Sequence, residues 1–205
     1  MKQPPAIEPT PSALLAEPLS WLSAEHDRHR QYCRLVEEVA LAPVVMAEAI
    51  QELMMFFHHD LPLHIRDEEE DLFALLRQRC APEDDLERIL DNLSADHRSD
   101  MDTIATLRGH LEAALRRRQP ISNDPEVQRL FIAFVAHERN HVALENAVIL
   151  PIARLRLTQA DLDRLCRRMV ARRGLPVLPD RTSGDRLNSH FDQEDGEGCH
   201  NPDQE

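Results

Sequence analysis

Two stretches of the chain share one pattern: HIRDEEEDLF at residues 64–73 and HVALENAVILP at residues 141–151. Each begins with a histidine, has a glutamate four residues later, and continues into apolar residues at the same offset. Residues four apart lie on the same face of an α-helix, so each stretch presents an imidazole and a carboxylate side by side. The repeat predicts two helices that carry matching polar groups.

The polar groups of the second stretch fall on the apolar face of its helix. Residues at helical spacing form one stripe, which consists of Leu130, Phe134, His137, His141, Glu145, Val148, Ile152 and Leu155. A histidine and a carboxylate on the core side cost free energy unless another group compensates them. The sequence therefore predicts buried partners for His141 and Glu145.

Two further regions carry histidines on an apolar stripe. One stripe consists of Leu22, His26, His29, Cys33 and Val36, and the other of Leu90, Leu93, His97, Met101, Ile104 and Leu107. A single inward histidine is usually a satisfied core residue, and a single His-x-x-x-Glu pattern also arises on exposed faces. Four regions that each place a histidine inward favour a shared site instead.

Proline, glycine and capping residues divide the chain into helices. The expected helices span residues 20–40, 44–80, 82–118 and 122–157, followed by a shorter helix over 158–172. Pro62 marks a break or kink inside the second of them, because proline removes a backbone hydrogen bond. Four long helices with short connections predict an all-α fold, an up-down-up-down four-helix bundle with a short extra C-terminal helix.

Composition divides the 205 residues into one domain and two tails. Residues 1–18 are rich in proline and are expected to form a flexible N-terminus. Residues 19–173 are expected to form the four-helix domain, with the ligands in 20–157. Residues 174–205 are acidic and poor in apolar residues. We expect them to be a disordered tail that solubilises the domain or binds a basic protein partner.

Charge and hydropathy exclude several classes of function. The net charge of −13 has the wrong sign for a protein that binds nucleic acid or an anionic membrane surface. No apolar run approaches the roughly 20 residues that span a bilayer, and the N-terminus lacks the pattern of a secretory signal, so a cytoplasmic location is expected. The four cysteines have no CxxC spacing, which leaves the eleven histidines as the feature to explain.

The helical registers bring four imidazoles and two carboxylates together. We assume that the four inward histidines share one layer of the bundle. The layer one helical turn away then contains Glu68 and Glu145, together with Leu22 and Leu93. This ligand mixture describes a two-metal site that suits iron or manganese, and the absence of thiolate argues against structural zinc. The candidate ligands are His26, His64, Glu68, His97, His141 and Glu145.

The next layer in the opposite direction holds polar residues whose role the sequence leaves open. It contains His29, Asp60 or His59, Met101 and His137. A further metal ligand, a hydrogen bond to a ligand or bound water, and polar residues near a solvent-accessible bundle end all fit. Glu69 adjoins Glu68 and could replace it if the helix is locally distorted.

These residues resemble the hemerythrin family, in particular its bacterial branch with the HHE cation-binding domain. The resemblance covers about residues 20–157 and rests on four motifs. They are Ala24-Glu25-His26, His64-x-x-x-Glu68-Glu69-x-x-Leu72-Phe73, Ala95-Asp96-His97 and His141-x-x-x-Glu145-Asn146-x-x-x-Leu150-Pro151. The resemblance implies a bundle around an oxo- or hydroxo-bridged non-haem di-iron centre. It assigns the six candidate ligands to two iron ions, with Glu68 and Glu145 as the bridging carboxylates.

The sequence departs from the oxygen-carrying members of that family at one position. Those members have a second histidine one turn from the first on the third helix, where this chain has Leu93 and Met101 on either side of His97. One iron is then short of a nitrogen ligand unless His29 or His137 supplies it. An open metal position suits sensing, an encounter with NO or peroxide, or iron handling better than tight reversible O₂ carriage.

The expected function is binding or sensing of O₂ or a related small oxidant at the di-iron centre. Two ferrous ions can donate two electrons to O₂, and an apolar wall of Leu22, Leu93, Phe134 and Val148 is expected to keep water out. The alternative is an enzyme that turns over peroxide or NO, or that oxidises Fe²⁺, at the same site. Because the same ligands would serve either function, no catalytic residue is assigned.

Overall fold

The computed structural model describes residues 7–176, and all regular secondary structure in that range is helical, as predicted. The long helices are α1 (Pro18–Leu41), α5 (Glu87–Arg117) and α6 (Pro125–Leu144). Shorter α-helices are α2 (Ala47–Met55), α3 (Leu61–Asp67), α4 (Phe73–Arg79), α7 (Leu150–Arg156) and α8 (Gln159–Arg172). Single 3₁₀ turns are η1 (Ser12–Ala16), η4 (Pro82–Asp84) and η5 (Ile121–Asn123).

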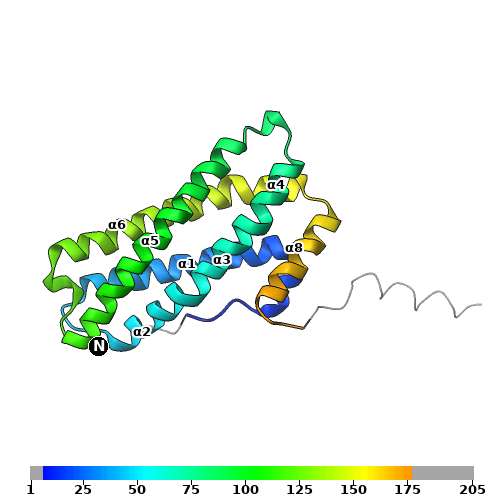
Figure 1. Ribbon diagram of the computed structural model, residues 1–205. Helices are drawn as coiled ribbons and strands as arrows, with labels where there is room; N and C mark the ends of the chain where they lie inside the picture. Colours follow the sequence, from blue (N-terminus) through cyan, green and yellow to red (C-terminus); the bar gives the residue numbers. More distant parts are fainter. Residues whose placement is uncertain (1–6, 177–205) are drawn as a thin grey trace, which may run out of the picture.

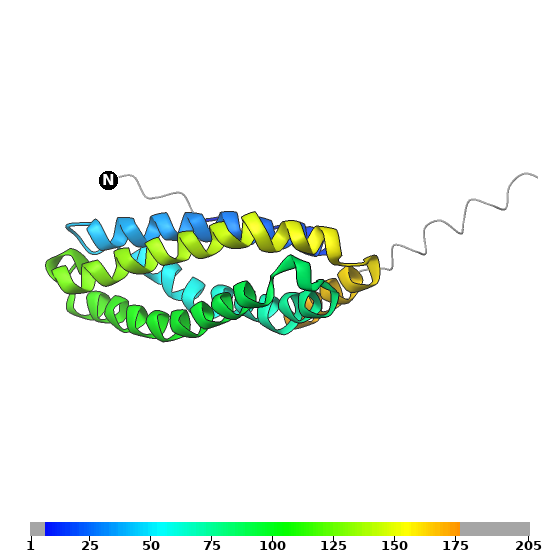
Figure 2. The same ribbon diagram turned by 90° about the horizontal axis from the view of Figure 1, so that it is seen from above.

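The helices form an elongated bundle. Figures 1 and 2 show α1, α5 and α6 extended along one common direction, with α2, α3 and α4 following one another along the same direction. Helix α8 lies at one end of the bundle, where it contacts α1 and η1. Within the described residues, no helix combines the length and apolarity needed to cross a membrane.

Three π-helical turns interrupt the α-helical geometry: η2 (Phe56–Asp60), η3 (Glu68–Leu72) and η6 (Glu145–Ile149). Each closes with a wide backbone hydrogen bond, for example from the Leu61 N–H to the Phe56 carbonyl and from the Leu150 N–H to the Glu145 carbonyl. Pro62 and Pro151 directly follow two of these bonds. The expected break at Pro62 therefore takes the form of a π turn, and the chain remains helical on both sides of it.

The π turn η6 shifts the register of everything that follows it. The sequence placed Leu155 on the inward stripe, but its side chain is 74% exposed. The buried residues of this segment are Ile149, Leu150, Ala153 and Leu157. A π turn inserts one extra residue into the helix, so a stripe extrapolated at 3.6 residues per turn moves off the core after Glu145.

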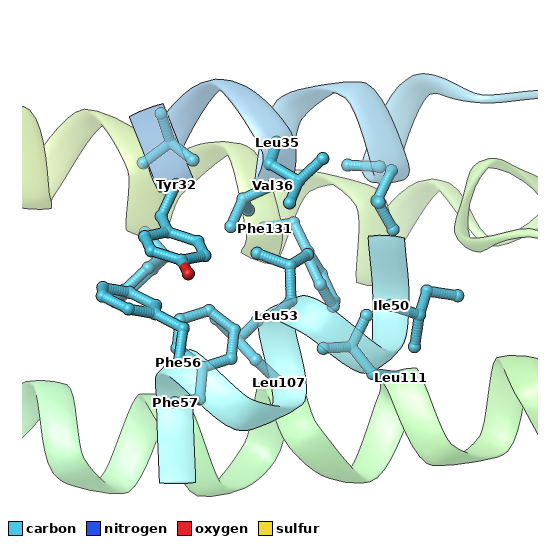
Figure 3. Packing of buried hydrophobic residues seen from close by; sticks show 14 of the residues in the cluster. Tyr32, Leu35, Val36, Ile50, Leu53, Phe56, Phe57, Leu107, Leu111 and Phe131 are labelled. Carbon is cyan, nitrogen blue, oxygen red and sulfur yellow. The ribbon is translucent and has the colours of Figure 1, made fainter. Parts of the chain in front are cut away.

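The hydrophobic core has two parts. The Phe57 cluster includes Leu53, Phe57, Leu107, Leu111 and Phe131, and Figure 3 shows how these side chains interlock. The Phe73 cluster includes Leu15, Leu22, Phe73, Leu93 and Leu150. Along α1, α5 and α6–α7, buried histidines and acids separate the residues of one cluster from those of the other. A polar layer therefore lies between two apolar half-cores.

The N-terminal segment packs against this bundle from residue 7 onward, whereas composition predicted a flexible start over residues 1–18. Leu15 in η1 is fully buried, and the backbone N–H of Ile7 donates to Glu52 Oε1 at 3.2 Å. Burial of these apolar side chains offsets the entropy of ordering a short segment. The acidic tail expected over 174–205 lies almost entirely outside the described residues.

Candidate metal centre

Four helical segments bring the six candidate ligands to one place in the polar layer. The histidines lie on α1, α3, α5 and α6, and the two glutamates open the π turns η3 and η6. All six side chains are at most 6% exposed. Glu68 and Glu145 are the first residues of π turns η3 and η6. Each lies one helical turn after a histidine of the same helical segment, which is His64 or His141.

The ligand atoms form two groups of four that share both carboxylates. One group contains His26 and His64 with Glu68 and Glu145, and the other contains His97 and His141 with the same two glutamates. Within each group the ligand atoms lie within 4.8 Å of one another. This arrangement offers two adjacent cation positions joined by two carboxylates.

Each carboxylate directs one oxygen toward each group. Glu68 Oε1 lies 3.3 Å from His26 Nε2 and 3.2 Å from His64 Nε2, while its Oε2 lies 3.4 Å from His97 Nε2. Glu145 Oε2 lies 3.3 Å from His26 Nε2, and its Oε1 lies 3.3 Å from His141 Nε2. Both glutamates therefore have the orientation of bridging ligands.

The donor set fits a pair of cations. Glu68 Oε2 and both oxygens of Glu145 are buried and accept no hydrogen bond, although imidazole nitrogens lie close by. If two donor atoms each lie about 2.1 Å from one ion and at right angles to each other, they are about 3.0 Å apart. The distances between the imidazole nitrogens and the carboxylate oxygens given above are close to this value. Buried carboxylates without hydrogen bonds are costly unless a positive charge compensates them. The residues present thus suit two bound cations.

Outer partners hold the imidazoles with Nε2 inward. His26 Nδ1 lies 3.0 Å from Asn146 Oδ1, and His97 Nδ1 lies 2.6 Å from Glu69 Oε1. With a metal bound, such contacts would fix the tautomer and leave the Nε2 lone pair to the ion. The sequence pattern contained Asn146 without giving it a role, and it considered Glu69 only as a replacement for Glu68. The sequence did contain one signal for these roles: Asn146 and Glu69 each directly follow a candidate glutamate.

Comparison with known protein families identifies the family of this chain. A family model described as the hemerythrin HHE cation-binding domain matches residues 17–153. The chain belongs to this family. The matched range contains all six candidate ligands and ends before α8. A search of curated proteins finds no match.

The second polar layer of the HHE domain differs from the sequence expectation. Met101 is 41% exposed, and Asp100 takes the inward position instead. His137 is partly exposed and lies with its Nε2 3.3 Å from Asp100 Oδ1, outside both ligand groups. Asp60 pairs with Arg28. On a helix, the buried stripe that contains His97 can continue at residue 100 or at residue 101. In this structure Asp100 is the buried residue and Met101 is exposed.

A small cavity adjoins the second ligand group. Its volume is about 10 Å³, which is close to what one water molecule needs. The cavity is lined by His29, Leu61, His64, Ile65, His97, Asp100, Glu138, His141, Val142 and Glu145. The apolar wall expected from Leu22, Leu93, Phe134 and Val148 does not line it. Those four side chains pack in or against the two apolar clusters, and the cavity is lined by ionisable side chains together with Leu61, Ile65 and Val142.

Ion pairs connect the C-terminal end of helix α8 to the π turn that begins at Glu68. Arg172 donates to Asp67 and, at 2.7 Å, to Asp71, while Arg173 donates to Asp67 at 2.6 Å. Asp67 is fully buried and directly precedes Glu68. The family match does not include α8, so this ion-pair cluster lies partly outside the shared domain.

The carboxylates raise the pKa of three candidate ligands. Burial lowers the pKa of His64, but the neighbouring carboxylates, Glu68 foremost, together outweigh that effect and raise it to about 9. The same balance raises the pKa of His97 to about 10, mainly through Glu68 and Glu69, and that of His141 to about 9, mainly through Glu145. In the absence of metal these imidazoles hold protons that a bound cation must displace.

These pKa values predict how stability of the metal-free chain depends on pH. The folded state holds these protons more tightly than the unfolded chain, whose histidines titrate near 6.5. The stabilisation is complete below about pH 6.5 and is lost as the pH rises toward 9 to 10. Urea unfolding with a chelator present should give a lower free energy of unfolding at about pH 9 than at about pH 6. Equal free energies of unfolding at the two pH values would contradict the raised pKa values of His64, His97 and His141.

Proposed function

We propose that the HHE domain is an up-down-up-down bundle that holds a dinuclear non-haem iron centre, which binds or senses O₂ or a related oxidant such as NO or peroxide. His26 and His64 would hold one ion, His97 and His141 the other, and Glu68 and Glu145 would bridge them. The observation that carries this proposal is that the two ligand groups share both carboxylates. Imidazole and carboxylate suit iron, and manganese also fits.

The residues around the ligands support binding of a small molecule. A reduced iron pair supplies electrons to a bound oxidant. The chain itself supplies four donors to each position, fewer than the six of an octahedral ion, so each position keeps open coordination sites. The cavity beside His97 and His141 offers space only for a molecule of about the size of water. The two apolar clusters pack on either side of this polar layer.

The alternative is an enzyme that turns over peroxide or NO, or that oxidises Fe²⁺, at the same centre. The observation that favours it is that Asp100 and Glu138 line the cavity and place carboxyl groups beside the second ligand group. Carboxyl groups in this position can carry protons to a reduced oxidant. A site that only binds its ligand does not need such proton carriers.

Metal content and an optical spectrum test the proposed centre together. Protein from iron-replete cells is expected to contain about two irons per chain, and its reduced form should gain a charge-transfer band in the near-ultraviolet to visible range on exposure to air. Iron below about one ion per two chains would overturn the proposal.

Steady-state assays separate binding from turnover. If the alternative holds, the wild-type protein consumes peroxide or NO over many cycles, and His141→Ala abolishes this consumption because it removes a ligand beside the cavity. Stoichiometric uptake without further cycles supports a binding or sensing role. His110→Ala, which lies outside both ligand groups, serves as the control.

A further inference from the structure

A third group of ligand-type side chains lies beside the two groups of the proposed centre. Glu25, His29 and His64 each bring one ligand atom within 4.8 Å of the others. Glu25 and His29 are one turn apart on α1, so they share a face, and His64 reaches them from α3. All three side chains are almost completely buried.

His29 has the same arrangement as the candidate ligands of the dinuclear centre. Its Nδ1 lies 3.2 Å from Glu138 Oε1, as the outer nitrogens of His26 and His97 lie close to Asn146 and Glu69. Both ring nitrogens of His29 are buried, and neither has a hydrogen-bond partner. A buried imidazole with a carboxylate close to one nitrogen and no hydrogen bond at the other is typical of a metal ligand.

The charges around this group favour a cation. Glu25 and Glu138 are buried acids, and Arg28 pairs with both Glu25 and Asp60. Arg28 brings one guanidinium, which it shares between Glu25 at 3.4 Å and Asp60. The Thr10 hydroxyl also donates to Glu25. Acids therefore outnumber the neighbouring guanidinium, and a divalent cation that displaces the proton of His64 would compensate them.

His64 connects this group to the dinuclear centre. Its Nε2 lies 3.2 Å from Glu68 Oε1, while its Nδ1 is buried without a hydrogen-bond partner. A neutral imidazole has one free lone pair, so it serves one ion at a time. An ion held by Glu25, His29 and His64 would therefore leave this group when His64 binds at the dinuclear centre. The cavity that His29 and His64 line also reaches His97 and His141.

We propose that Glu25, His29 and His64 form a loading site, which holds a divalent transition-metal cation before it moves into the dinuclear centre. This inference rests on the proposed centre as the destination. Two imidazoles and one carboxylate suit Fe²⁺, Mn²⁺, Co²⁺ or Zn²⁺ and disfavour Ca²⁺ and Mg²⁺, which prefer oxygen ligands. Glu138 positions His29, and Thr10 positions Glu25.

The rate of metal uptake tests the loading site. Metal-free full-length chain is mixed with Co²⁺ without oxygen, and the visible spectrum is followed to completion. His29→Gln and Glu25→Gln are expected to slow uptake by about tenfold or more while the final content remains about two ions per chain. His137→Gln, the same substitution outside the group, should load at the wild-type rate. Far-ultraviolet circular dichroism confirms that each variant is folded.

The outcomes separate this inference from the proposed function. Wild-type rates in both His29→Gln and Glu25→Gln would overturn the loading site and leave the dinuclear centre intact. A final content near one ion in His29→Gln would also overturn it, because His29 would then be a ligand of the centre itself. A wild-type chain that binds no more than one Co²⁺ would overturn the dinuclear centre and, with it, the destination of the loaded ion.

Discussion

Glu68→Gln should lower the metal content from about two ions per chain to fewer than one. Glu68 directs Oε1 toward His26 and His64 and Oε2 toward His97, so one side chain serves both positions. Glutamine keeps the volume but removes the negative charge and replaces one ligand oxygen with an NH₂ group, which has no lone pair available for a cation. Elemental analysis after iron-replete expression, or anaerobic titration with Co²⁺, measures the loss.

Two further variants make this result specific. Glu70→Gln makes the same chemical change two residues away in the same π turn, at a half-exposed side chain, and should keep about two ions. His26→Gln removes a residue that belongs to only one ligand group, so it should keep about one ion. If Glu68→Gln and His26→Gln lose the same amount of metal, Glu68 does not bridge the two positions.

Arg172→Ala should destabilise the domain by about 3 kcal/mol, which corresponds to a fall in Tm of roughly 6–12 °C for a domain of this size. Arg172 contacts Asp67 and Asp71, which are both buried. Removal of the guanidinium leaves these carboxylates with only Arg173 and Arg168 as partners. The loss of a buried partner costs far more than the loss of an exposed one, because the remaining charge cannot return to water.

Arg30→Ala is the matched control for this prediction. Arg30 also lies on a helix and pairs with an acid, but its partner Asp27 is exposed and three residues away on the same helix. Such pairs contribute at most about 1 kcal/mol. Thermal unfolding of the metal-free proteins gives both values. Equal shifts for the two variants would show that the α8 arginines act only as surface charges.

The sequence predicted the helices and brought the candidate ligands together because both depend on local periodicity. Histidines on apolar stripes are informative, since a polar group rarely faces a core without a reason. The family match over residues 17–153 agrees with the motifs around His26, His64, His97 and His141. Neither the helix bounds nor the identity of the metal follows from that match.

The errors have two physical causes. Leu155 was misplaced because a π turn adds one residue that no hydropathy pattern reveals. Met101 and Asp100 exchanged roles, and Glu25 and Glu138 were missed, because sequence reasoning places charged residues on the surface by default. Their burial depends on partners from other helices, which only the tertiary structure brings together.

The polar layer between the Phe57 and Phe73 clusters has a mechanical consequence. The long helices run through both half-cores, but the side chains that face each other at mid-length are acids and imidazoles rather than interlocked hydrocarbons. Bound ions at this level would act as cross-links among four helical segments and make the two ends of the domain open as one cooperative unit. Without them, each end keeps its own apolar cluster and can fray independently, so hydrogen exchange at the two ends would become uncoupled. The metals would thus determine whether this domain behaves as one folding unit or as two.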